Sequence, residues 1–463
     1  MTNVEGAGMK LKVAVIISMA LGTLTAYSQP RSMPGSEQGE MPPFLFLEAV
    51  NLISPDSSHS RLDVHYRIDR SFFVAVKNRD ASSSWDFISR GEILIEVFDS
   101  MQVSRSRSIQ RAEIGAERSE REPTEKSWYQ GIASFELVPG LHKIVFEIDD
   151  LESERRYVDE RTTVRLKRFG ASSRETSTPL FVEWVDGKST PHNMTPIGFG
   201  PHLLFGKKAT LLIELPFDKA AAGNVEAIYS VSMTSNLGRS TTVVLAETLT
   251  NIVVFPKAKL EGTKENDKVA YTISTSDSSK ALGVLIPMTS EKLSLRRFDL
   301  DVTIKVDNAA FKTTKAFQMV WPDMPFSLRD IDNAISTLKY ITTEDQRDSI
   351  RRGNLDERRD NLEAFWTRKD PTAETAYNEV MVEYYRRVDH ATRTFGILRD
   401  PDGFKSDRGR IYILYGPPTS TGRTLSPTSG YQEEWTYANL GKRFIFADQS
   451  KNGNYVLVST QSL

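Results

Sequence analysis

The stretch that decides the fold of this 463-residue chain runs from residue 365 to residue 418. It begins with Phe365-Trp366, continues through NEVMVEYYRR at 378–387, and ends with DRGRIYILYGPP at 407–418. Aromatic, charged and turn residues alternate here in a more ordered pattern than elsewhere in the chain. We therefore expect a folding unit built around this stretch.

Helices are predicted first in this unit. Apolar residues at spacings of three and four, from Tyr377 to Phe395, predict a helix that Asp370 caps, with Pro371 at its first position. Upstream, residues 327–340 carry an apolar helical stripe, and residues 343–368 predict helix with a break at Gly353-Asn354.

Strands follow the helices. Alternating residues predict four strands, at 410–415, 434–437, 443–448 and 455–459. The Ser/Thr/Gly-rich segment 419–430 is expected to be a mobile loop. The C-terminal domain, residues 327–463, is thus predicted as α+β, with helices covering one face of an antiparallel meander.

The rest of the chain predicts β-structure. Residues 44–168 and 180–320 each contain short strands, joined by a Ser/Thr linker at 169–179. Residues 61–68 alternate apolar and polar side chains, as a strand does when one of its faces meets solvent; residues 72–76 predict the next strand. We expect a multidomain, mainly β protein: two immunoglobulin-like β-sandwiches, then the α+β domain.

The N-terminus has the pattern of a secretory signal. Two lysines precede the apolar run 13–24, and Ala26 and Ser28 place small residues before a cleavage site at Gln29. Residues 1–28 are therefore predicted to be a signal peptide and residues 29–43 a flexible linker. We expect an exported protein, periplasmic or extracellular, with no transmembrane segment after cleavage.

Composition excludes several functions. The net charge of −2 argues against binding nucleic acid through phosphate neutralisation, so we expect no nucleic-acid partner. Cysteine is absent, which excludes thiol nucleophiles and cysteine-ligated metals. The six histidines show no metal-binding spacing, so we expect neither a metal site nor a cofactor.

The ordered stretch resembles the GWxTD domain, a family of predicted exported bacterial proteins. The residues that carry the resemblance are Phe365, Trp366, Asp370, Pro371, Asn378, Glu379, Glu383, Tyr384, Tyr385, Arg386, Arg387, Gly403, Phe404, Ser406, Asp407, Arg408, Gly409, Arg410, Tyr415, Gly416, Pro417 and Trp435. Phe404 and Ser406 stand where the named motif has Trp and Thr. The resemblance implies two preceding sandwich domains and no established activity.

The polar residues of this stretch allow two interpretations. Glu379, Glu383 and Asp407, with His390, could form a carboxylate cluster for acid–base chemistry or for a cation. Alternatively, they could form an ion-pair lattice in which Arg408 or Arg410 neutralises the two glutamates. Gly403 and Gly409 indicate either positive φ or close backbone approach.

These patterns leave two functional hypotheses open. The first is an exported, non-enzymatic cell-envelope protein whose C-terminal domain binds a protein or envelope partner, with the sandwiches as spacers. The alternative is a carboxylate- or cation-dependent, hydrolase-like enzyme in the C-terminal domain. No pattern in the sequence indicates an oligomeric state.

Overall fold

The computed structural model describes residues 44–80, 82–116, 128–170, 172–184, 192–198, 201–217, 224–234, 241–250, 252–265, 268–397, 400–426 and 430–463. The predicted signal peptide and flexible linker, residues 1–43, lie outside these ranges. Within the described ranges, none of the helices combines the length and the apolar character needed to cross a membrane.

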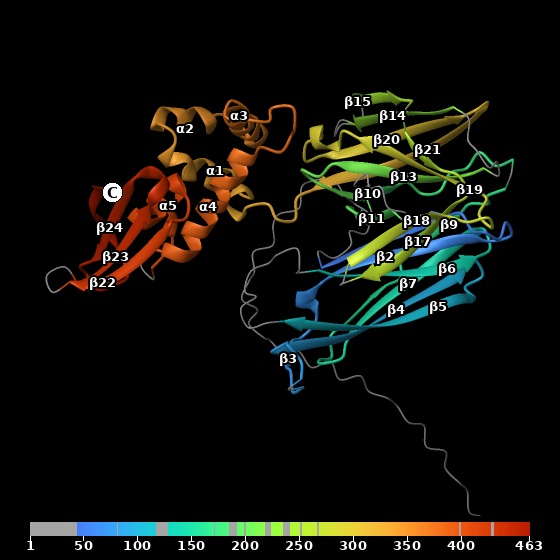
Figure 1. The fold of residues 1–463 in the computed structure, drawn as a ribbon, viewed down its shortest axis with the longest axis horizontal. Helices are drawn as coiled ribbons and strands as arrows, with labels where there is room; N and C mark the ends of the chain where they lie inside the picture. The colour runs from blue at the N-terminus through green and yellow to red at the C-terminus, as the bar shows by residue number, and fades with distance from the viewer. Residues whose placement is uncertain are drawn as a thin grey trace, which may run out of the picture. The chain divides into compact units, whose positions relative to one another are not determined.

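The first sandwich packs two antiparallel sheets around one core (Figure 1). The smaller sheet has the strand order β1-β2-β6, with bounds Leu45–Leu52, Ser60–Asp69 and Trp128–Leu137. The larger sheet contains β3 (Val76–Lys77), β4 (Phe87–Asp99), β5 (Ser104–Ala116), β7 (Gly140–Asp150), β8 (Arg156–Asp159) and β9 (Thr163–Leu166). The strand predicted at 72–76 is wrong, because Asp69 caps a 3₁₀ turn there, Arg70–Phe72.

The second sandwich is built in the same way. Its seven-stranded sheet runs β16 (Val253–Phe255), β19 (Ala281–Met288), β13 (Ala209–Pro216), β10 (Leu180–Glu183), β11 (His192–Pro196), β18 (Lys268–Thr275) and β17 (Ala258–Glu265). Its five-stranded sheet runs β12 (His202–Leu204), β21 (Ala309–Val320), β20 (Arg297–Val306), β14 (Val225–Thr234) and β15 (Thr241–Leu249). Among the strands that the structure describes here, β12 and β21 form the one parallel pair.

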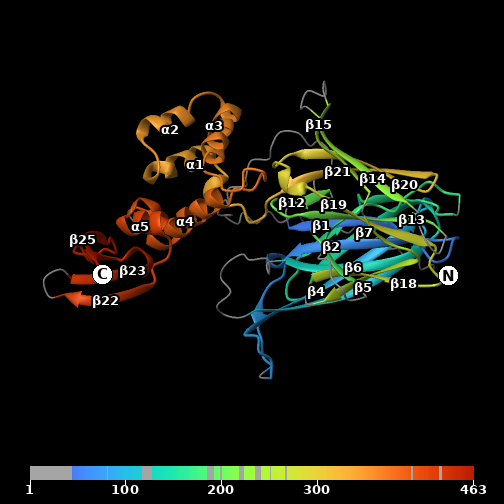
Figure 2. The same ribbon diagram turned by 45° about the horizontal axis from the view of Figure 1, so that its top comes forward.

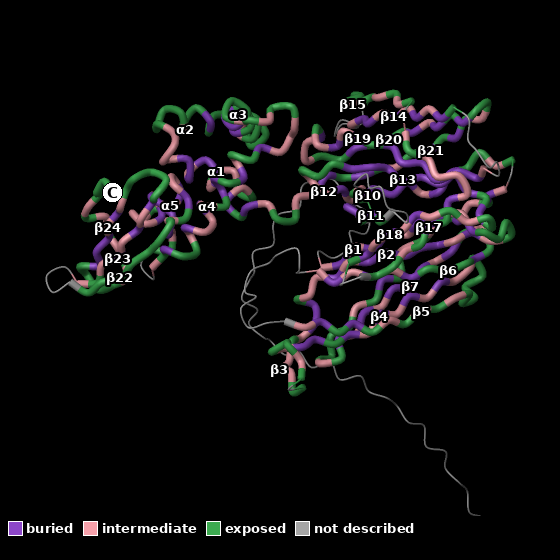
Figure 3. The backbone as a smooth tube through the Cα atoms, in the orientation of Figure 1, coloured by how far each residue is buried: buried purple, intermediate pink, exposed green. Residues whose placement is uncertain are grey.

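A further apolar core joins the two sandwiches. Val50 and Leu52 of β1 pack with residues of the seven-stranded sheet such as Leu212 and Tyr271. The small sheet of the first sandwich and the seven-stranded sheet are therefore each buried on both faces. Figure 3 shows the result in β13, which is buried along its whole length. In the segment predicted as a linker, Thr176 and Ser177 are fully buried beside this core.

The core between the two sandwiches changes the environment of strand β2. Its apolar residues, including Leu62 and Val64, enter the first core, as the alternation predicts. Its polar residues Asp63 and His65 are fully buried instead of facing solvent. The expectation of a half-solvated strand is wrong, because the second sandwich covers the polar face.

The C-terminal domain begins with helices, as predicted. Their bounds are α1 (Ile331–Thr337), α2 (Glu344–Ile350), α3 (Leu355–Thr367), α4 (Glu379–Phe395) and α5 (Asp407–Tyr415). The predicted break before α3 is confirmed, because Asn354 caps that helix. The predicted start of α4 is wrong: Asn378 is its cap, and the Asp370 carboxylate instead accepts a hydrogen bond from the Thr372 amide in a local turn.

The meander has four antiparallel strands, but not the first one predicted. They are β22 (Ser420–Ser426), β23 (Gly430–Tyr437), β24 (Lys442–Asp448) and β25 (Val456–Ser462). Residues 410–415 form helix α5, because Ser406 caps the segment and Gly416, at φ 78°, ends it. The segment predicted as a mobile loop supplies β22.

Helices α4 and α5 cover one face of this sheet (Figure 2). Val388 and Phe395 of α4 share a core with Trp435 of β23 and Phe446 of β24. The predicted fold class, two sandwiches followed by a helical segment and a meander, is confirmed.

Candidate functional site

The loop at 403–407 is a helix-capping device. The Ser406 hydroxyl accepts a hydrogen bond from the Gly409 amide at 3.0 Å and donates one to the Gly403 carbonyl at 2.7 Å. A side-chain oxygen at this position satisfies an amide that has no partner within the helix. Ser406 keeps the hydroxyl of the Thr that it replaces in the motif, and with it the cap.

Both glycines of the loop are required by close packing. A Cβ on Gly403 would lie 2.3 Å from the Ala391 carbonyl oxygen, and one on Gly409 would lie 2.2 Å from the Gly403 carbonyl oxygen. Neither glycine has a positive φ. Of the two predicted reasons for these glycines, close backbone approach is the one that applies.

Asp407 connects helix α5 to the last strand. One carboxylate oxygen accepts a hydrogen bond from the Leu457 amide at 2.9 Å, and the other pairs with Arg410 at 2.9 Å. As the first helical residue, Asp407 also interacts favourably with the helix N-terminus. Asp407 therefore joins the motif loop to β25.

Arg408 forms the buried part of this arrangement. Its guanidinium pairs with Glu433 at 3.1 Å and lies 4.3 Å from the Tyr455 ring centroid. The second Glu433 oxygen accepts a hydrogen bond from the Trp435 indole at 2.9 Å. Strand β23 therefore supplies the partner of Arg408, so Arg408 is not the predicted partner of the α4 glutamates.

The four polar candidates do not form a cluster. Glu379 accepts a hydrogen bond from Thr372 at 2.6 Å, Glu383 pairs with Arg387 one turn along the helix at 2.6 Å, and Asp407 is held as described above. The His390 ring stacks on Tyr412 with centroids 4.3 Å apart. Among the described residues, no group of three His, Asp or Glu side chains is placed to hold a metal ion.

The upstream motif residues hold α3, α4 and α1 together. Asn378 caps α4 and also donates a hydrogen bond to the Trp366 carbonyl at 2.9 Å. The Tyr384 hydroxyl donates to the Thr337 carbonyl at 2.6 Å, and the Tyr385 hydroxyl donates to the Ala334 carbonyl at 3.1 Å. Most of the motif aromatics are core residues, and burial raises the pKa of Tyr385.

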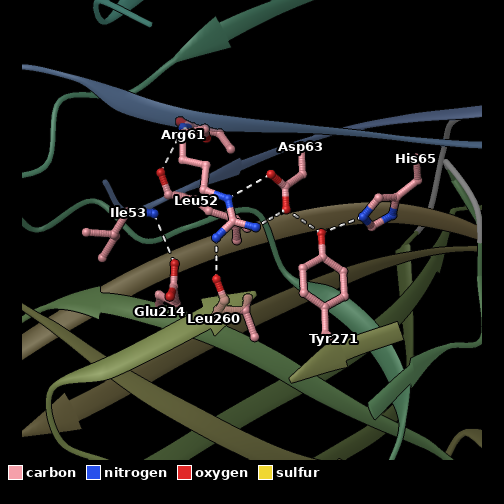
Figure 4. Close-up of polar contacts among 9 residues, drawn as sticks. Leu52, Ile53, Arg61, Asp63, His65, Glu214, Leu260 and Tyr271 are labelled. Atoms are coloured by element: carbon pink, nitrogen blue, oxygen red, sulfur yellow. Dashed lines mark hydrogen bonds and ion pairs between the residues drawn. The ribbon is translucent and has the colours of Figure 1, made fainter. Parts of the chain in front are cut away.

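A second polar cluster, which the sequence did not predict, lies between the two sandwiches (Figure 4). Arg61 and Asp63 form a two-pronged ion pair, at 2.8 and 2.7 Å. The Tyr271 hydroxyl of the second sandwich donates to Asp63 at 2.8 Å and lies 2.5 Å from His65 Nε2. Arg61 also donates to the Leu260 carbonyl, so three side chains of β2 bind the second sandwich.

The cluster extends to two more carboxylates. Glu48 pairs with Lys315 at 2.6 Å and lies 3.8 Å from His65 Nδ1. Glu214 of β13 accepts a hydrogen bond from the Ile53 amide at 3.0 Å. We call these seven residues the interface cluster: Glu48, Arg61, Asp63, His65, Glu214, Tyr271 and Lys315.

The charges of the interface cluster require one bound proton for neutrality. It has three carboxylates and two permanent cations, Arg61 and Lys315. Because Tyr271 donates its single hydrogen to Asp63, His65 Nε2 must donate to the Tyr271 oxygen. A proton on the Glu214 carboxyl would make the cluster neutral.

Burial determines how these groups titrate. It raises the pKa of Glu214 to about 7, although the Ile53 amide and Arg61 act in the opposite direction. Burial also raises the pKa of Tyr271 well above its usual value, and Asp63 adds to this effect. Burial would raise the pKa of Glu48 as well, but Lys315 and His65 outweigh it and lower that pKa. The Glu214 carboxyl therefore titrates near neutral pH.

Comparison with known proteins supports one assignment. Residues 303–463 match the model of the GWxTD domain. The chain contains a GWxTD domain. The match begins within β20 of the second sandwich and reaches the last residue, so it includes the whole capping loop and the meander.

Other comparisons add little. The search of curated proteins found no significant match. Among solved structures, the chain is similar to the Streptococcus agalactiae AgI/II polypeptide BspA C-terminal domain, with 11% identity over 60% of this chain and 100% of that one. The TM-score is 0.15, which is too low to support an inference.

Within the GWxTD domain, the motif residues therefore cap helices, connect α5 to strands of the meander and form part of the core. These residues were predictable from the sequence, but most of their partners were not. The interface cluster was not predicted, and the sequence signal for it is the alternation of charged and apolar residues at 61–68.

Proposed function

We propose that the protein is an exported, non-enzymatic cell-envelope protein. Its GWxTD domain binds a protein or envelope partner, and the two sandwiches act together as a spacer. The proposal applies to the mature chain after removal of residues 1–28.

The main support for this proposal is that each candidate carboxylate is bound by a different partner within the protein. Glu379 is engaged by Thr372, Glu383 by Arg387, and Asp407 by the Leu457 amide of the last strand. General acid–base chemistry needs such groups to converge on one substrate position. Their arrangement supports structural roles in the domain.

An apolar pair on the meander supports a binding role. Leu425 of β22 and Tyr431 of β23 lie directly opposite each other and are 70% and 56% exposed. Large exposed apolar side chains placed side by side are typical of contact surfaces. The shared core between the sandwiches supports the spacer role, since it leaves little freedom between them.

Cross-linking in producing cells tests the binding role. The variant Leu425→Ser/Tyr431→Ser is expected to lose a specific cross-linked partner that the unaltered protein captures. Val243→Ser is the matched control, because Val243 is 60% exposed in the second sandwich and its variant should keep the partner. N-terminal sequencing of the mature protein tests export, with Gln29 expected as the first residue.

The hydrolase-like alternative makes a different prediction for Asp407→Asn. An enzyme that uses this carboxylate would keep its melting temperature and lose its activity. Our proposal expects a lower melting temperature, because the amide weakens the contacts to Arg410 and Leu457.

A further inference from the structure

The inference starts from a cavity at one end of the first sandwich. Its volume is about 430 Å³, and its lining includes the ends of β4, β6 and β7 and the turn that joins β6 to β7. Because β6 belongs to the smaller sheet and β4 and β7 to the larger one, the cavity spans both sheets. Its size lies within the range of roughly 300–1,000 Å³ that is usual for ligand sites.

One lining residue, His142, has a buried nitrogen without a hydrogen-bond partner. His142 is 5% exposed and continues the row of β7 core residues Ile144 and Phe146, so its ring points between the two sheets. Its Nε2 lies 2.9 Å from the Val138 carbonyl oxygen, which only accepts, so Nε2 carries the hydrogen. In the neutral ring Nδ1 is then an acceptor, and no described residue donates to it. A ligand that donates a hydrogen bond would satisfy this nitrogen.

A neutral ion pair forms another part of the lining. One Asp99 oxygen accepts hydrogen bonds from the Met101 and Val103 amides, at 2.8 and 3.0 Å. The other accepts one from Arg105 Nε at 2.7 Å. Both oxygens of Asp99 are therefore in use, and the charges of Asp99 and Arg105 cancel.

Two further carboxylates give the cavity a net negative charge. Glu136 of β6 lines the cavity and makes no ion pair with a described residue. His59 also lines it, and its Nδ1 lies 2.7 Å from the Asp56 carboxylate. Whether His59 is neutral or protonated, these groups carry more negative than positive charge. The charges therefore favour a cation as the ligand.

Apolar side chains border the same cavity. Val138 and Leu141 line it and are 58% and 44% exposed. Met101 and Val103, in the turn between β4 and β5, are also exposed. Large apolar side chains exposed together are typical of contact surfaces. They suit an aliphatic chain that ends in a charged group, because such chains pack their carbon atoms on apolar surface.

We propose that this cavity binds an ammonium group carried on an aliphatic chain, as a lysine side chain or a free alkylamine presents it. The ammonium donates to His142 Nδ1 and is attracted by Glu136, and the chain packs on Val138 and Leu141. The site goes beyond the proposed function, which gives the first sandwich only a spacer role. Either proposal can fail without the other.

NMR titration of the full mature chain tests the site. The probes are N-acetyl-lysine methylamide, n-butylammonium and N-acetyl-norleucine methylamide, which has the aliphatic chain without the ammonium, all at constant ionic strength. The ring signals of His59 and His142 report occupancy, whereas those of His65 and His202, which do not line the cavity, should stay unchanged. We expect saturable shifts with an ammonium probe and at least fivefold weaker binding of the norleucine probe.

The two ammonium probes distinguish the sources of the ligand. Tighter binding of the lysine probe assigns the site to a polypeptide side chain. Equal or tighter binding of n-butylammonium assigns it to a free amine, because the peptide groups then contribute nothing.

A pair of variants makes the test specific. Glu136→Gln should weaken binding of the ammonium probe at least fivefold and leave the melting temperature unchanged, because its exposed side chain holds no partner in the fold. Glu113→Gln is the matched control: it makes the same change of charge on an exposed residue of β5 that does not line the cavity. Its binding should equal that of the unaltered protein.

Three results would overturn the proposal. The first is the absence of saturable shifts of the His59 and His142 signals with either ammonium probe, which needs no variant. The second is equal binding of the norleucine probe, because the ammonium would then contribute nothing. The third is an equal loss of binding in Glu136→Gln and Glu113→Gln, because only the overall charge would then matter.

Discussion

The interface cluster and the capping loop both use charged residues, but the contacts that define them span very different distances along the chain. In the capping loop, Ser406 contacts residues three positions away, and Asp407 pairs with Arg410. In the interface cluster, Asp63 meets Tyr271, which is 208 positions away. The loop organises a helix, whereas the cluster organises two domains.

This difference has an energetic consequence. A local contact at the surface is partly replaced by water when it is lost, so its contribution to stability is small. A charge buried between two sandwiches has no water to replace its partner, so breaking its pair is costly. Substitutions in the two regions test this contrast.

Asp63→Ala should have the largest effect. It removes the carboxylate that holds both Arg61 and Tyr271 in a buried place. Breaking a buried pair in this way costs roughly 3–5 kcal/mol. Urea denaturation of the full chain measures the change, and a loss below about 1 kcal/mol would contradict the proposed importance of the cluster.

Glu214→Gln should remove a pH dependence. Burial raises the pKa of Glu214 from its ordinary 4.5 to about 7 in the folded state, so its proton favours the folded state at low pH. Stability is therefore lost as pH rises from about 4.5 through 7, by about 3 kcal/mol in total at 1.36 kcal/mol per pKa unit. Gln keeps an acceptor for the Ile53 amide and cannot ionise, so the variant should be more stable than the unaltered protein at pH 8.5.

The control for this titration is Glu261→Gln, since the Glu261 side chain is about half exposed on β17. Between pH 5.5 and pH 8.5, the melting temperature should fall by the same amount in this variant and in the unaltered protein. A similar fall in Glu214→Gln would show that another group carries the pH dependence.

Gly403→Ala should destabilise the GWxTD domain by steric conflict. The added Cβ meets backbone atoms of α4 at 2.3 Å, which cannot move aside as a flexible side chain would. Overpacking of this kind typically costs about 1–3 kcal/mol. In Gly422→Ala, the matched control, the nearest atom lies 3.9 Å away, so thermal unfolding should be little changed.

Ser406→Ala should cost about 1 kcal/mol, the usual contribution of a helix cap. Ser406→Thr, which restores the motif residue, should keep the stability of the unaltered protein. Thermal unfolding of the three proteins measures both effects. Equal losses of stability in Ser406→Ala and Ser406→Thr would show that the hydroxyl does not provide the stabilisation.

Glu383→Ala should have the smallest effect. Its pair with Arg387 lies one helical turn away on an exposed surface. Such pairs contribute roughly 0.3–0.5 kcal/mol and less at high salt. A loss as large as that of Asp63→Ala, measured in the same way, would remove the contrast between the two regions.

The regular elements were largely predictable where the signals were local. Asn354 lies in the break between α2 and α3 and caps α3. The strands around Ile93, Phe135 and Leu300 follow from alternation. Prediction failed at residues 410–415, where β-branched and aromatic residues indicated a strand. There the Ser406 cap and the packing of α5 on α4 outweigh strand propensity.

In the candidate site, too, only the features with a local sequence pattern were predictable. The motif residues were found, and close backbone approach was one of the two reasons predicted for the glycines, because caps and close approaches leave a local pattern. The partner of Arg408 was not found, since Glu433 is 25 positions away, on a strand of the meander.

Sequence patterns were enough to predict the α+β domain with its motif and the β-character of the preceding regions. The burial of the polar face of β2 against a second domain follows only from how the sandwiches pack. The physical reason is that alternation reports only that one face of a strand is polar. The polar side chains of that face can bond either to water or to buried charged partners. Which of the two they meet depends on how the second sandwich packs.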